Sequence, residues 1–505
     1  MVISLKKLFP LKKSELTLLF MVIILLSLSN ILPYFFQDSI NRGFPLHNDE
    51  LFHLNQAKHL RSGSYEFNSL SGLEIGFHFF LFFLDLFFDL IKIYPLLSLI
   101  WMFITSIIIF LVTFNLTEKN YFVSLFTLIF FGSIGIDNLF LGMSFFTPLA
   151  FSIPFIFIYI YLFFEGLRTE NKKFLFYSFL FMMLLLFFHP ASIVFFIPLM
   201  VFQLFKYKPF IIKEKKFFSI FLVIPLVALF FYILLIKGYF KFDFILNLIY
   251  FQKDWASIET LKKIKFTKLY SPFNFFLSLI GIFYLFLKRK KKYYPYILLV
   301  FSLFLIIICF NLFSFSLFGP AQRIYFYFLI FLPLFSAFGL FFIFRTILDF
   351  LNQKKISKLF IIMILILILS ISLFLSYSSS ISEKINFNSF INLNKNEYDV
   401  LRFLSKIDSG NIIVPLNHLS PFIKSFAGQE PVSTWYFYHP ERRQTVDSFY
   451  SIDDCNLKDS VIKYYHLDYV LSTRLILCEE FKLIYPVGPY VYDVSYLSKN
   501  YYTKV

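Results

Sequence analysis

A dense group of titratable side chains lies near the start of the chain, in the segment HNDELFH over residues 47–53. Two adjacent carboxylates, Asp49 and Glu50, stand between two imidazoles. A carboxylate at a membrane surface can act as a general base that takes a proton from an acceptor hydroxyl or amine as it attacks an activated carbon. Carboxylates and imidazoles together can also bind a divalent metal ion. A structural reading stays open, in which Asp49 caps a surface helix over 50–61.

The composition of the chain indicates an integral membrane protein. Of 505 residues, 58% are hydrophobic and only 15% are charged, and the mean hydropathy is +0.72. Apolar runs recur from Leu16 to Leu375, and a helix needs about 20 apolar residues to span a bilayer. The net charge is +16, but Lys and Arg lie largely in short loops between the runs, where they orient the protein. We therefore expect membrane lipids, and no nucleic acid, as partners.

About eleven spans are predicted in the cell membrane, with the N-terminus in the cytoplasm. The basic clusters at 206–216, 288–292 and 345–358 then lie on the inner side, while the short outer loops hold one basic residue, Arg323. This asymmetry follows the excess of Lys and Arg in cytoplasmic loops. The predicted spans are 15–34, 94–116, 121–136, 145–165, 173–189, 190–206, 216–237, 272–288, 294–316, 324–346 and 357–377.

The apolar segment 73–91 is long enough to be read as a further span, but we place it on the outer surface. Its Asp85 and Asp89 lie four residues apart and so share one face of a helix. Charged groups in the middle of a bilayer are costly. Counting 73–91 as a span would also move the later basic clusters outside. We therefore predict an amphipathic helix at the interface.

The sequence thus predicts a mainly α-helical polytopic protein with outer-surface amphipathic helices and a small extracytoplasmic α/β domain. The membrane module is expected over 1–377 and the C-terminal domain over 378–505. Cys455 and Cys478 can form a disulfide if that domain is extracytoplasmic. The outer loops are 35–93, 137–144, 238–271 and 317–323. The elements predicted in the domain are helices over 397–407, 440–450 and 457–466, strands over 411–415 and 467–472, and a hairpin near 481–494.

The order of features in the first outer loop resembles the GT-C superfamily of membrane glycosyltransferases. An acidic pair is followed by a surface helix from Glu50 to Arg61, a glycine-containing turn and a second amphipathic helix. The superfamily includes protein O-mannosyltransferases, lipid A aminoarabinose transferases and oligosaccharyltransferases, which use polyprenyl-phosphate-linked sugars. The resemblance implies that Asp49 is the catalytic base, with Glu50 as the second candidate.

A second acidic position of this family matches Asp137, in the outer loop between the third and fourth predicted spans. The two-acid form that binds metal in oligosaccharyltransferases is missing here. A divalent cofactor such as Mg²⁺ or Mn²⁺ therefore stays an open question. Its candidate ligands are His47, Asp49, His53 and Asp137.

Two further matches are His189 and Arg323. His189-Pro190, at the outer junction of two predicted spans, resembles a turn of related members. A structural alternative is that Pro190 breaks the helix and His189 caps it. Arg323 begins a late span and precedes aromatic residues, which resembles the arginine that binds the donor phosphate. A guanidinium holds a phosphate by two parallel hydrogen bonds. The alternative is that Arg323 only anchors the helix end at the interface.

The C-terminal domain carries a looser resemblance. Trp435 and Tyr436 are similar to the aromatic acceptor motif of oligosaccharyltransferases, but the Asp and Gly of that motif are missing. Recognition of a peptide sequon is therefore not predicted, and packing of the domain is the simpler reading of these aromatic residues.

These features predict a glycosyltransferase that uses a polyprenyl-phosphate-linked sugar outside the cytoplasm. Asp49 would deprotonate a glycan, lipid or protein acceptor, and Arg323 would hold the departing phosphate in a single displacement that inverts the anomeric centre. Asp137 and His189 would support the base or the donor. Two alternatives stay open, a transporter or flippase and a polysaccharide polymerase or ligase of the cell envelope. Transporters place ionisable residues near mid-bilayer, whereas here nearly all charges lie at span ends.

Overall fold

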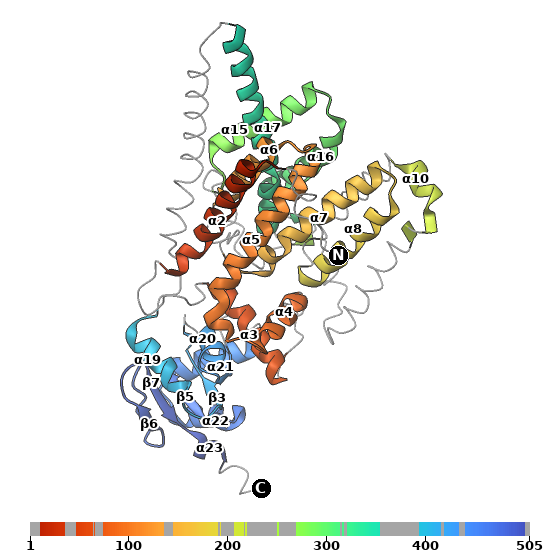
Figure 1. The fold of residues 1–505 in the computed structure, drawn as a ribbon. Helices are drawn as coiled ribbons and strands as arrows, with labels where there is room; N and C mark the ends of the chain where they lie inside the picture. The colour runs from red at the N-terminus through yellow and green to blue at the C-terminus, as the bar shows by residue number, and fades with distance from the viewer. Residues whose placement is uncertain are drawn as a thin grey trace. The chain divides into compact units, whose positions relative to one another are not determined.

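A computed structural model of the chain shows two compact units (Figure 1). The first unit comprises Met1–Pro33, Phe67–Gly76 and Leu96–Asn388, and the second comprises Tyr34–Glu66, Phe77–Pro95 and Ser389–Val505. The structure describes residues 11–35, 47–63, 65, 74–135, 145–189, 192, 207–216, 218–219, 250–251, 269–313, 316–317, 321–353, 393–415, 419–433 and 440–499.

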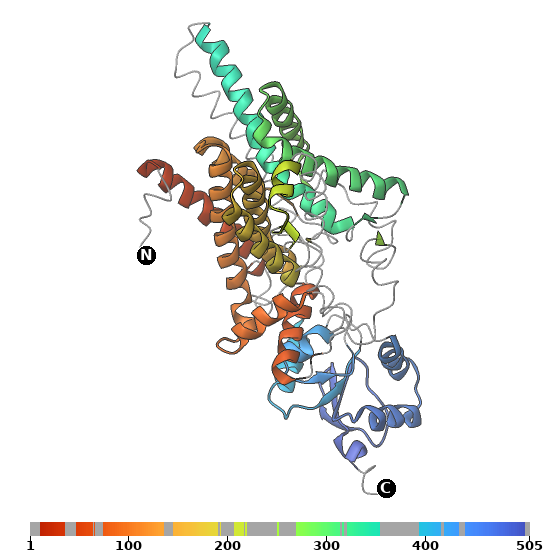
Figure 2. The same cartoon turned by 90° about the vertical axis from the view of Figure 1, so that its right-hand side faces the viewer.

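Helices dominate the first unit, and several of them pack side by side (Figure 2). By length and composition, five helices among the described residues can cross a membrane: Lys13–Ile31, Leu90–Leu116, Pro148–Arg168, Lys291–Phe313 and Arg323–Phe350. The helices are α2 (Lys13–Phe35), α5 (Leu90–Leu116), α6 (Tyr121–Gly132), α7 (Pro148–Arg168), α8 (Lys172–Phe188), α10 (Lys208–Lys213), α15 (Pro272–Leu287), α16 (Tyr294–Phe313) and α17 (Ala321–Gln353).

Five of the predicted spans coincide with helices that are long and apolar enough to cross a membrane, whereas α6, α8 and α15, with 12, 17 and 16 residues, are shorter than those five helices. Helices occupy most of the predicted spans 15–34, 94–116, 121–136, 145–165, 173–189, 272–288, 294–316 and 324–346. The predicted spans 190–206, 216–237 and 357–377 lie almost wholly outside the described residues. The total of about eleven spans, and the domain boundary at 377/378, therefore stay predictions.

Helices α15 and α17 approach each other closely at two glycines. A Cβ atom added at Gly281 would lie 1.9 Å from the carbonyl oxygen of Phe335, and one added at Gly339 would lie 2.0 Å from the carbonyl oxygen of Leu277. Small residues allow such backbone contact between helices in a membrane, where packing replaces the hydrophobic effect as the driving force. The two glycines therefore set the distance between the two helices.

The second unit contains a mixed five-stranded sheet in the order β4-β3-β5-β7-β6. Strand β3 pairs in parallel with β4 and β5, and β7 pairs antiparallel with β5 and β6. The strands are β3 (Asn411–Ile413), β4 (Glu430–Pro431), β5 (Tyr469–Ser472), β6 (Lys482–Tyr485) and β7 (Tyr490–Asp493). The helices of this segment are α19 (Lys395–Leu404), α20 (Ser420–Ser425), α21 (Pro440–Ser451), α22 (Cys455–Tyr465) and α23 (Ser495–Lys499).

Most elements predicted for residues 393–499 are present. The helix predicted over 397–407 is α19, and the hairpin predicted near 481–494 is formed by β6 and β7. Helix α20 and strand β4 were not predicted, because a six-residue helix and a two-residue strand are too short to leave a periodic pattern. The interior of the sheet is apolar, and residues such as Ile413, Val470 and Val491 are fully buried.

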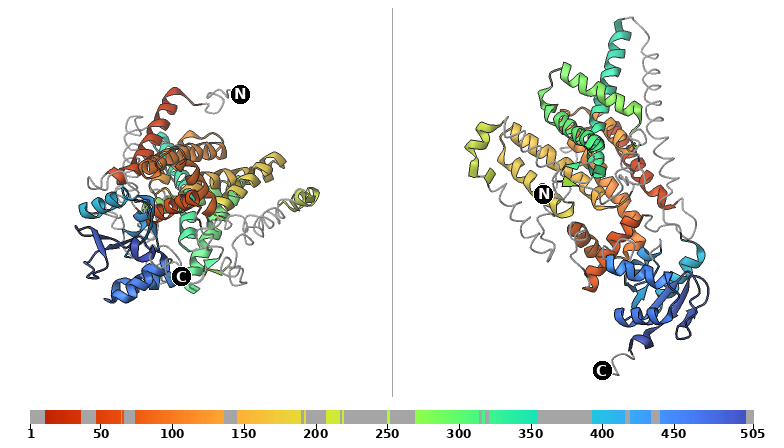
Figure 3. Two further views of the ribbon diagram at one scale, coloured as in Figure 1. Left: turned by 90° about the horizontal axis from the view of Figure 1, so that it is seen from below. Right: turned by 180° about the vertical axis from the view of Figure 1, so that it is seen from behind.

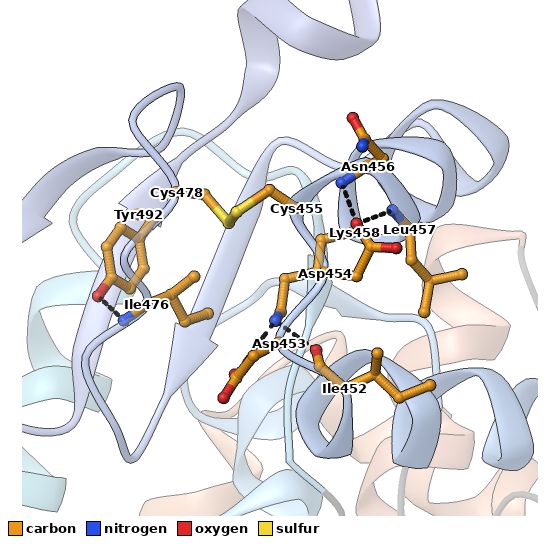
Figure 4. The surroundings of a disulfide bond; sticks show 10 residues. All are labelled: Ile452, Asp453, Asp454, Cys455, Asn456, Leu457, Lys458, Ile476, Cys478 and Tyr492. Atoms are coloured by element: carbon orange, nitrogen blue, oxygen red, sulfur yellow. Dashed lines mark hydrogen bonds and ion pairs between the residues drawn. A yellow bond between two sulfur atoms is a disulfide. The ribbon is translucent and has the colours of Figure 1, made fainter.

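A disulfide joins Cys455, at the start of α22, to Cys478, in the loop before β6 (Figure 4). The sequence left this pairing open. Beside the bond, the amino group of Lys458 donates a hydrogen bond to the carbonyl oxygen of Ile452 at 2.6 Å. The bond thus links α22 to the chain that leads into the β6–β7 hairpin.

The remaining helices precede α5 in the chain. They are α3 (Asn48–Ser62) and α4 (Ile75–Asp85). Helix α4 has 11 residues, which gives a length of about 16 Å, well short of the roughly 30 Å of a bilayer core. The expectation that Asp85 and Asp89 share one helical face is wrong, because α4 ends at Asp85 and the chain turns before Asp89.

We predict that Gly281→Ala lowers the stability of the protein by at least about 2 kcal/mol, because a methyl group at this position must push the backbone of α17 away. Thermal unfolding of the purified protein in detergent measures this loss. Gly488→Ala is the control, since its Cβ would make only an ordinary contact at 3.5 Å. Equal unfolding temperatures for the two variants would contradict the close packing of α15 and α17.

Candidate functional site

Helix α3 carries the acidic pair and begins two residues earlier than predicted. The N-cap is His47, whose Nδ1 accepts a hydrogen bond from the backbone N–H of Asp49 at 3.1 Å. In return, the Glu50 carboxylate accepts a hydrogen bond from the backbone N–H of His47 at 3.3 Å, which completes a capping box. The expected cap at Asp49 is therefore wrong. Asp49 instead lies in the first turn, where the helix dipole stabilises a negative charge.

The two carboxylates have different surroundings. Glu50 is fully buried, and its second oxygen accepts a hydrogen bond from the hydroxyl of Tyr34 at 2.5 Å. Both oxygens of Glu50 therefore hold the start of α3 in place. Asp49 is only partly buried, and among the described residues no hydrogen bond to its carboxylate is formed. Of the pair, Asp49 is thus the carboxylate that is open to a reacting molecule.

The imidazole of His47 is suited to its capping role. Burial lowers the pKa of His47, and the nearby charge of Asp49, which acts in the opposite direction, does not outweigh it. A lowered pKa favours the neutral ring at pH 7. Only the neutral ring can offer an unprotonated Nδ1 to the N–H of Asp49.

A chain of buried polar rings joins α3 to α4 within the second unit. Nδ1 of His53 lies 2.9 Å from Nε2 of His78, and Nδ1 of His78 lies 2.9 Å from the hydroxyl of Tyr65. His53 is 5% exposed and His78 is fully buried. The direction of each hydrogen bond depends on the tautomers of the two imidazoles.

A buried carboxylate fixes the other end of α4 to α3. The side chain of Asp85 is fully buried, and its oxygens lie 2.6 Å from the Lys58 amino group and 2.9 Å from the Arg61 guanidinium. Burial of a charge is tolerated only with such partners. This pairing explains why Asp85 turns inward to α3 while Asp89 remains at the surface.

His189 lies in the first unit and pairs with Glu74. Its backbone caps the end of α8, in agreement with the helix-ending reading of the His189-Pro190 turn. Its side chain is 2% exposed, and Nδ1 lies 3.0 Å from a carboxylate oxygen of Glu74. Glu74 was not identified from the sequence, because 115 residues separate the two partners.

Arg323 stands in the first turn of α17 and is partly buried. Its positive charge lies close enough to interact with His189 and with Tyr327, one turn further along the same helix. The rings of His189 and Tyr327 meet edge to face, with centroids 6.3 Å apart. The structure therefore brings together two residues that were predicted separately, Arg323 and His189, and adds Glu74 to them.

The remaining predicted residues are not described. Asp137 lies within residues 136–144, and Trp435 and Tyr436 lie within residues 434–439, all outside the described part of the chain. Their placement stays a prediction.

The proposed metal ligands do not form a site on their own among the described residues. No group of three or more His, Cys, Asp or Glu side chains in these ranges is arranged to hold a metal ion. His47 uses Nδ1 to cap α3, and His53 uses Nδ1 to contact His78. The two imidazoles are thus engaged in hydrogen bonds that organise the helices.

Some partners left a weak signal in the sequence. Glu74, His78 and Asp85 are three of the four ionisable residues of the otherwise strongly apolar segment 73–91, and ionisable residues in such a setting usually have a partner or a function. The sequence shows that partners must exist. It does not show which distant residues they are.

Three crystal structures of the Archaeoglobus fulgidus oligosaccharyltransferase resemble the chain in fold. The form tethered to an acceptor peptide containing the NVT sequon superposes with a TM-score of 0.53 at 11% identity, over 90% of this chain and 69% of that one. The apo form gives 0.51 at 13% identity with the same coverage. The complex with Zn and sulfate gives 0.53 at 12% identity, over 90% and 68%. At these identities the likeness shows the fold alone.

No protein-family model matches the sequence, and no curated protein is similar to it. The fold expected from the first outer loop, a helical membrane module with a small sheet-containing unit, is nevertheless confirmed in its main features by these solved structures and by the apolar helices.

We predict that Tyr34→Phe destabilises the protein by about 1–3 kcal/mol, because the buried carboxylate of Glu50 loses a hydrogen-bond donor. Thermal unfolding measures the change. Tyr464→Phe serves as the control, since Tyr464 is 76% exposed. If both variants unfold at the wild-type temperature, the contact between Tyr34 and Glu50 does not stabilise the start of α3.

Proposed function

We propose that the protein is a membrane glycosyltransferase that transfers a sugar from a polyprenyl-phosphate-linked donor to an acceptor outside the cytoplasm. One observation carries the proposal. Asp49 presents a carboxylate in the first turn of a firmly held helix, in a chain whose fold matches an oligosaccharyltransferase over 90% of its length. The crystal structure of that neighbour contains a tethered acceptor peptide. We propose that this chain also uses an acceptor, which is a glycan, a lipid or a protein.

Asp49 acts as the general base in this proposal. It takes the proton of the acceptor hydroxyl or amine while that atom forms a bond to the anomeric carbon. The bond from the anomeric carbon to the phosphate oxygen breaks, and its electron pair leaves with the lipid phosphate. Because one displacement occurs, the anomeric configuration inverts. Glu50, the second candidate, supports the reaction by fixing the start of α3, since both of its oxygens are engaged.

Arg323 binds the phosphate of the donor. A guanidinium can hold two phosphate oxygens at once and stabilise the charge that develops on them as the bond to the sugar breaks. The pairing of His189 with Glu74 near Arg323 supports a role for His189 beside the donor. Asp137 is proposed as the second acidic residue of the site.

A divalent metal such as Mg²⁺ or Mn²⁺ is kept as a candidate cofactor, with His47, Asp49, His53 and Asp137 as its candidate ligands. One neighbouring oligosaccharyltransferase structure is a complex with Zn and sulfate. Because the described ligands do not form a site on their own, we assign no step of the reaction to a metal.

The proposed topology places the N-terminus in the cytoplasm, about eleven spans over 1–377, and the domain over 378–505 outside the cytoplasm. The Cys455–Cys478 disulfide supports this placement of the domain, because disulfides persist in oxidising compartments.

A flippase or transporter of lipid-linked sugars is the second candidate. The pair of His189 and Glu74 favours it, because buried ionisable pairs are typical of transport pathways. A polysaccharide polymerase or ligase would use the same donor. Mass spectrometry of surface glycans and glycolipids in a deletion strain separates transfer from transport, since loss of one sugar from a finished product indicates transfer, whereas accumulation of an unflipped precursor indicates transport.

We predict that Asp49→Asn lowers the rate of sugar transfer at least about 100-fold, because the amide cannot accept the proton. The measurement is release of polyprenyl phosphate from a radiolabelled polyprenyl-phosphate sugar in membranes that contain the variant. Asp453→Asn is the control, because Asp453 is exposed and lies outside the proposed site. Full activity of Asp49→Asn would exclude Asp49 as the base.

For Arg323 we expect Arg323→Ala to raise the KM for the lipid-linked donor about 10-fold or more, and Arg323→Lys to raise it less, because lysine keeps the charge and loses the paired hydrogen bonds. Arg345→Ala, at an exposed position of the same helix, should leave the KM unchanged. A donor KM that does not respond to Arg323→Ala would mean that Arg323 only anchors the helix end.

A further inference from the structure

One face of α3 packs against α20, which belongs to the C-terminal part of the second unit and is followed in the chain by β4 (Figure 1, Figure 3). On this face, Asn55 and His59 lie one helical turn apart. The side-chain amide of Asn55 donates a hydrogen bond to the carbonyl oxygen of Pro421 at 2.8 Å. Nδ1 of His59 lies 3.3 Å from the Glu430 carboxylate.

The next position on the same face continues the pattern. The amino group of Lys424 reaches the hydroxyl of Ser62 at 3.5 Å, and the same amino group contacts the Glu430 carboxylate. The contacts from Asn55 to Ser62 therefore follow α3 for about two turns.

The two residues of α3 that make the first of these polar contacts are buried, whereas Ser62 is exposed. Asn55 is 3% exposed and His59 is 4% exposed. Their apolar neighbours Leu51, Leu54 and Ala57 are fully buried. Burial of these side chains stabilises the packing of α3, but the hydrophobic effect is non-directional and does not select one orientation of the helix. Hydrogen bonds in a buried setting have a narrow geometry, so they select one orientation of the helix among those that apolar packing would allow.

A second side of α3 is fixed by α4. The contact of His53 with His78 lies toward the start of α3, and the ion pairs of Lys58 and Arg61 with Asp85 lie toward its end. The helix is thus held from two directions along its length. Its N-terminal turn, with Asp49, is held by the hydrogen bonds of Glu50 and is continuous with the helix that these contacts orient.

We propose that α20 and β4 position the catalytic helix, with Asn55 and Glu430 as positioning residues that act on the reaction through Asp49. The inference rests on the proposed function, because it takes Asp49 as the base. A displacement of about 1 Å at a reacting group can lower a rate about 100-fold. A C-terminal segment more than 350 residues from Asp49 in sequence is therefore part of the catalytic machinery.

Two variants test the contacts with little change in shape. Asn55→Asp replaces the N–H donor by a carboxylate that faces the carbonyl oxygen of Pro421. Glu430→Gln removes the charge beside His59 at a position that is 35% exposed, so that the protein folds even if Asn55→Asp does not. We expect kcat of each variant to fall about 10-fold or more, with the KM for the lipid-linked donor within about twofold of the wild type. The rates are normalised to the folded fraction of each variant, because partial unfolding alone would also lower the apparent kcat without changing the KM.

The controls carry the same chemical changes at exposed positions of the same unit. Asn456→Asp and Glu441→Gln should leave kcat, KM and stability unchanged. Hydrogen exchange adds a measurement that needs no activity. We expect the amides of α3 to exchange at least about 10-fold faster in Glu430→Gln, while β5 and β7 exchange as in the wild type.

The outcomes are distinct. A lowered kcat together with faster exchange in α3 supports the inference. Wild-type kcat in Glu430→Gln, or a lowered kcat without a change in α3, overturns it. Failure of the proposed function is recognised separately, since the wild-type protein would then show no sugar transfer. Failure of the base assignment would leave Asp49→Asn active, whereas failure of this inference leaves Asp49→Asn inactive and Glu430→Gln active.

Discussion

The buried carboxylate of Glu50 is the constraint on which the candidate site depends. A buried charge is costly unless it is hydrogen-bonded, and here the Tyr34 hydroxyl and the His47 N–H supply the bonds. These bonds fix where α3 begins. They also separate the roles of the acidic pair. Glu50 is used by the fold, and Asp49, its neighbour in the same turn, is left as the carboxylate that is accessible for chemistry.

The same rule governs the other ionisable groups of this apolar chain. Asp85 is buried against Lys58 and Arg61, and His189 is buried against Glu74. Each pair joins segments that are distant in sequence, so the pairs determine which parts of the chain fold back on one another. Packing without polar partners governs the contact of α15 with α17, where glycine allows the backbones to touch. Polar pairs thus determine which segments lie next to each other, while the small glycine residues determine how closely α15 and α17 approach.

Regular elements could be predicted from the sequence because they depend on local patterns. The apolar runs predicted helices at α2, at α5 to α8 and at α15 to α17, whereas the short helix α10 lies in a segment that was predicted as a loop. The β6–β7 hairpin was predicted near residues 481–494. The partners of charged groups could not be predicted. A buried charge needs a hydrogen-bonding or oppositely charged partner, but this requirement does not identify which distant residue the partner is. The cap at His47 was missed for a local reason, since histidine is an unusual N-cap and the adjacent Asp49 is a preferred one. Asp137 lies outside the described residues, so its predicted role is untested.

In the proposed function, Asp49 takes the proton of the acceptor, while Glu50 holds the start of α3 in place. The most direct test compares the single-turnover transfer rates of purified Asp49→Asn and Glu50→Gln, together with their unfolding temperatures. The account predicts that Asp49→Asn is as stable as the wild type and inactive, while Glu50→Gln is markedly less stable and its folded fraction still transfers sugar. A stable, inactive Glu50→Gln beside an active Asp49→Asn would contradict the account.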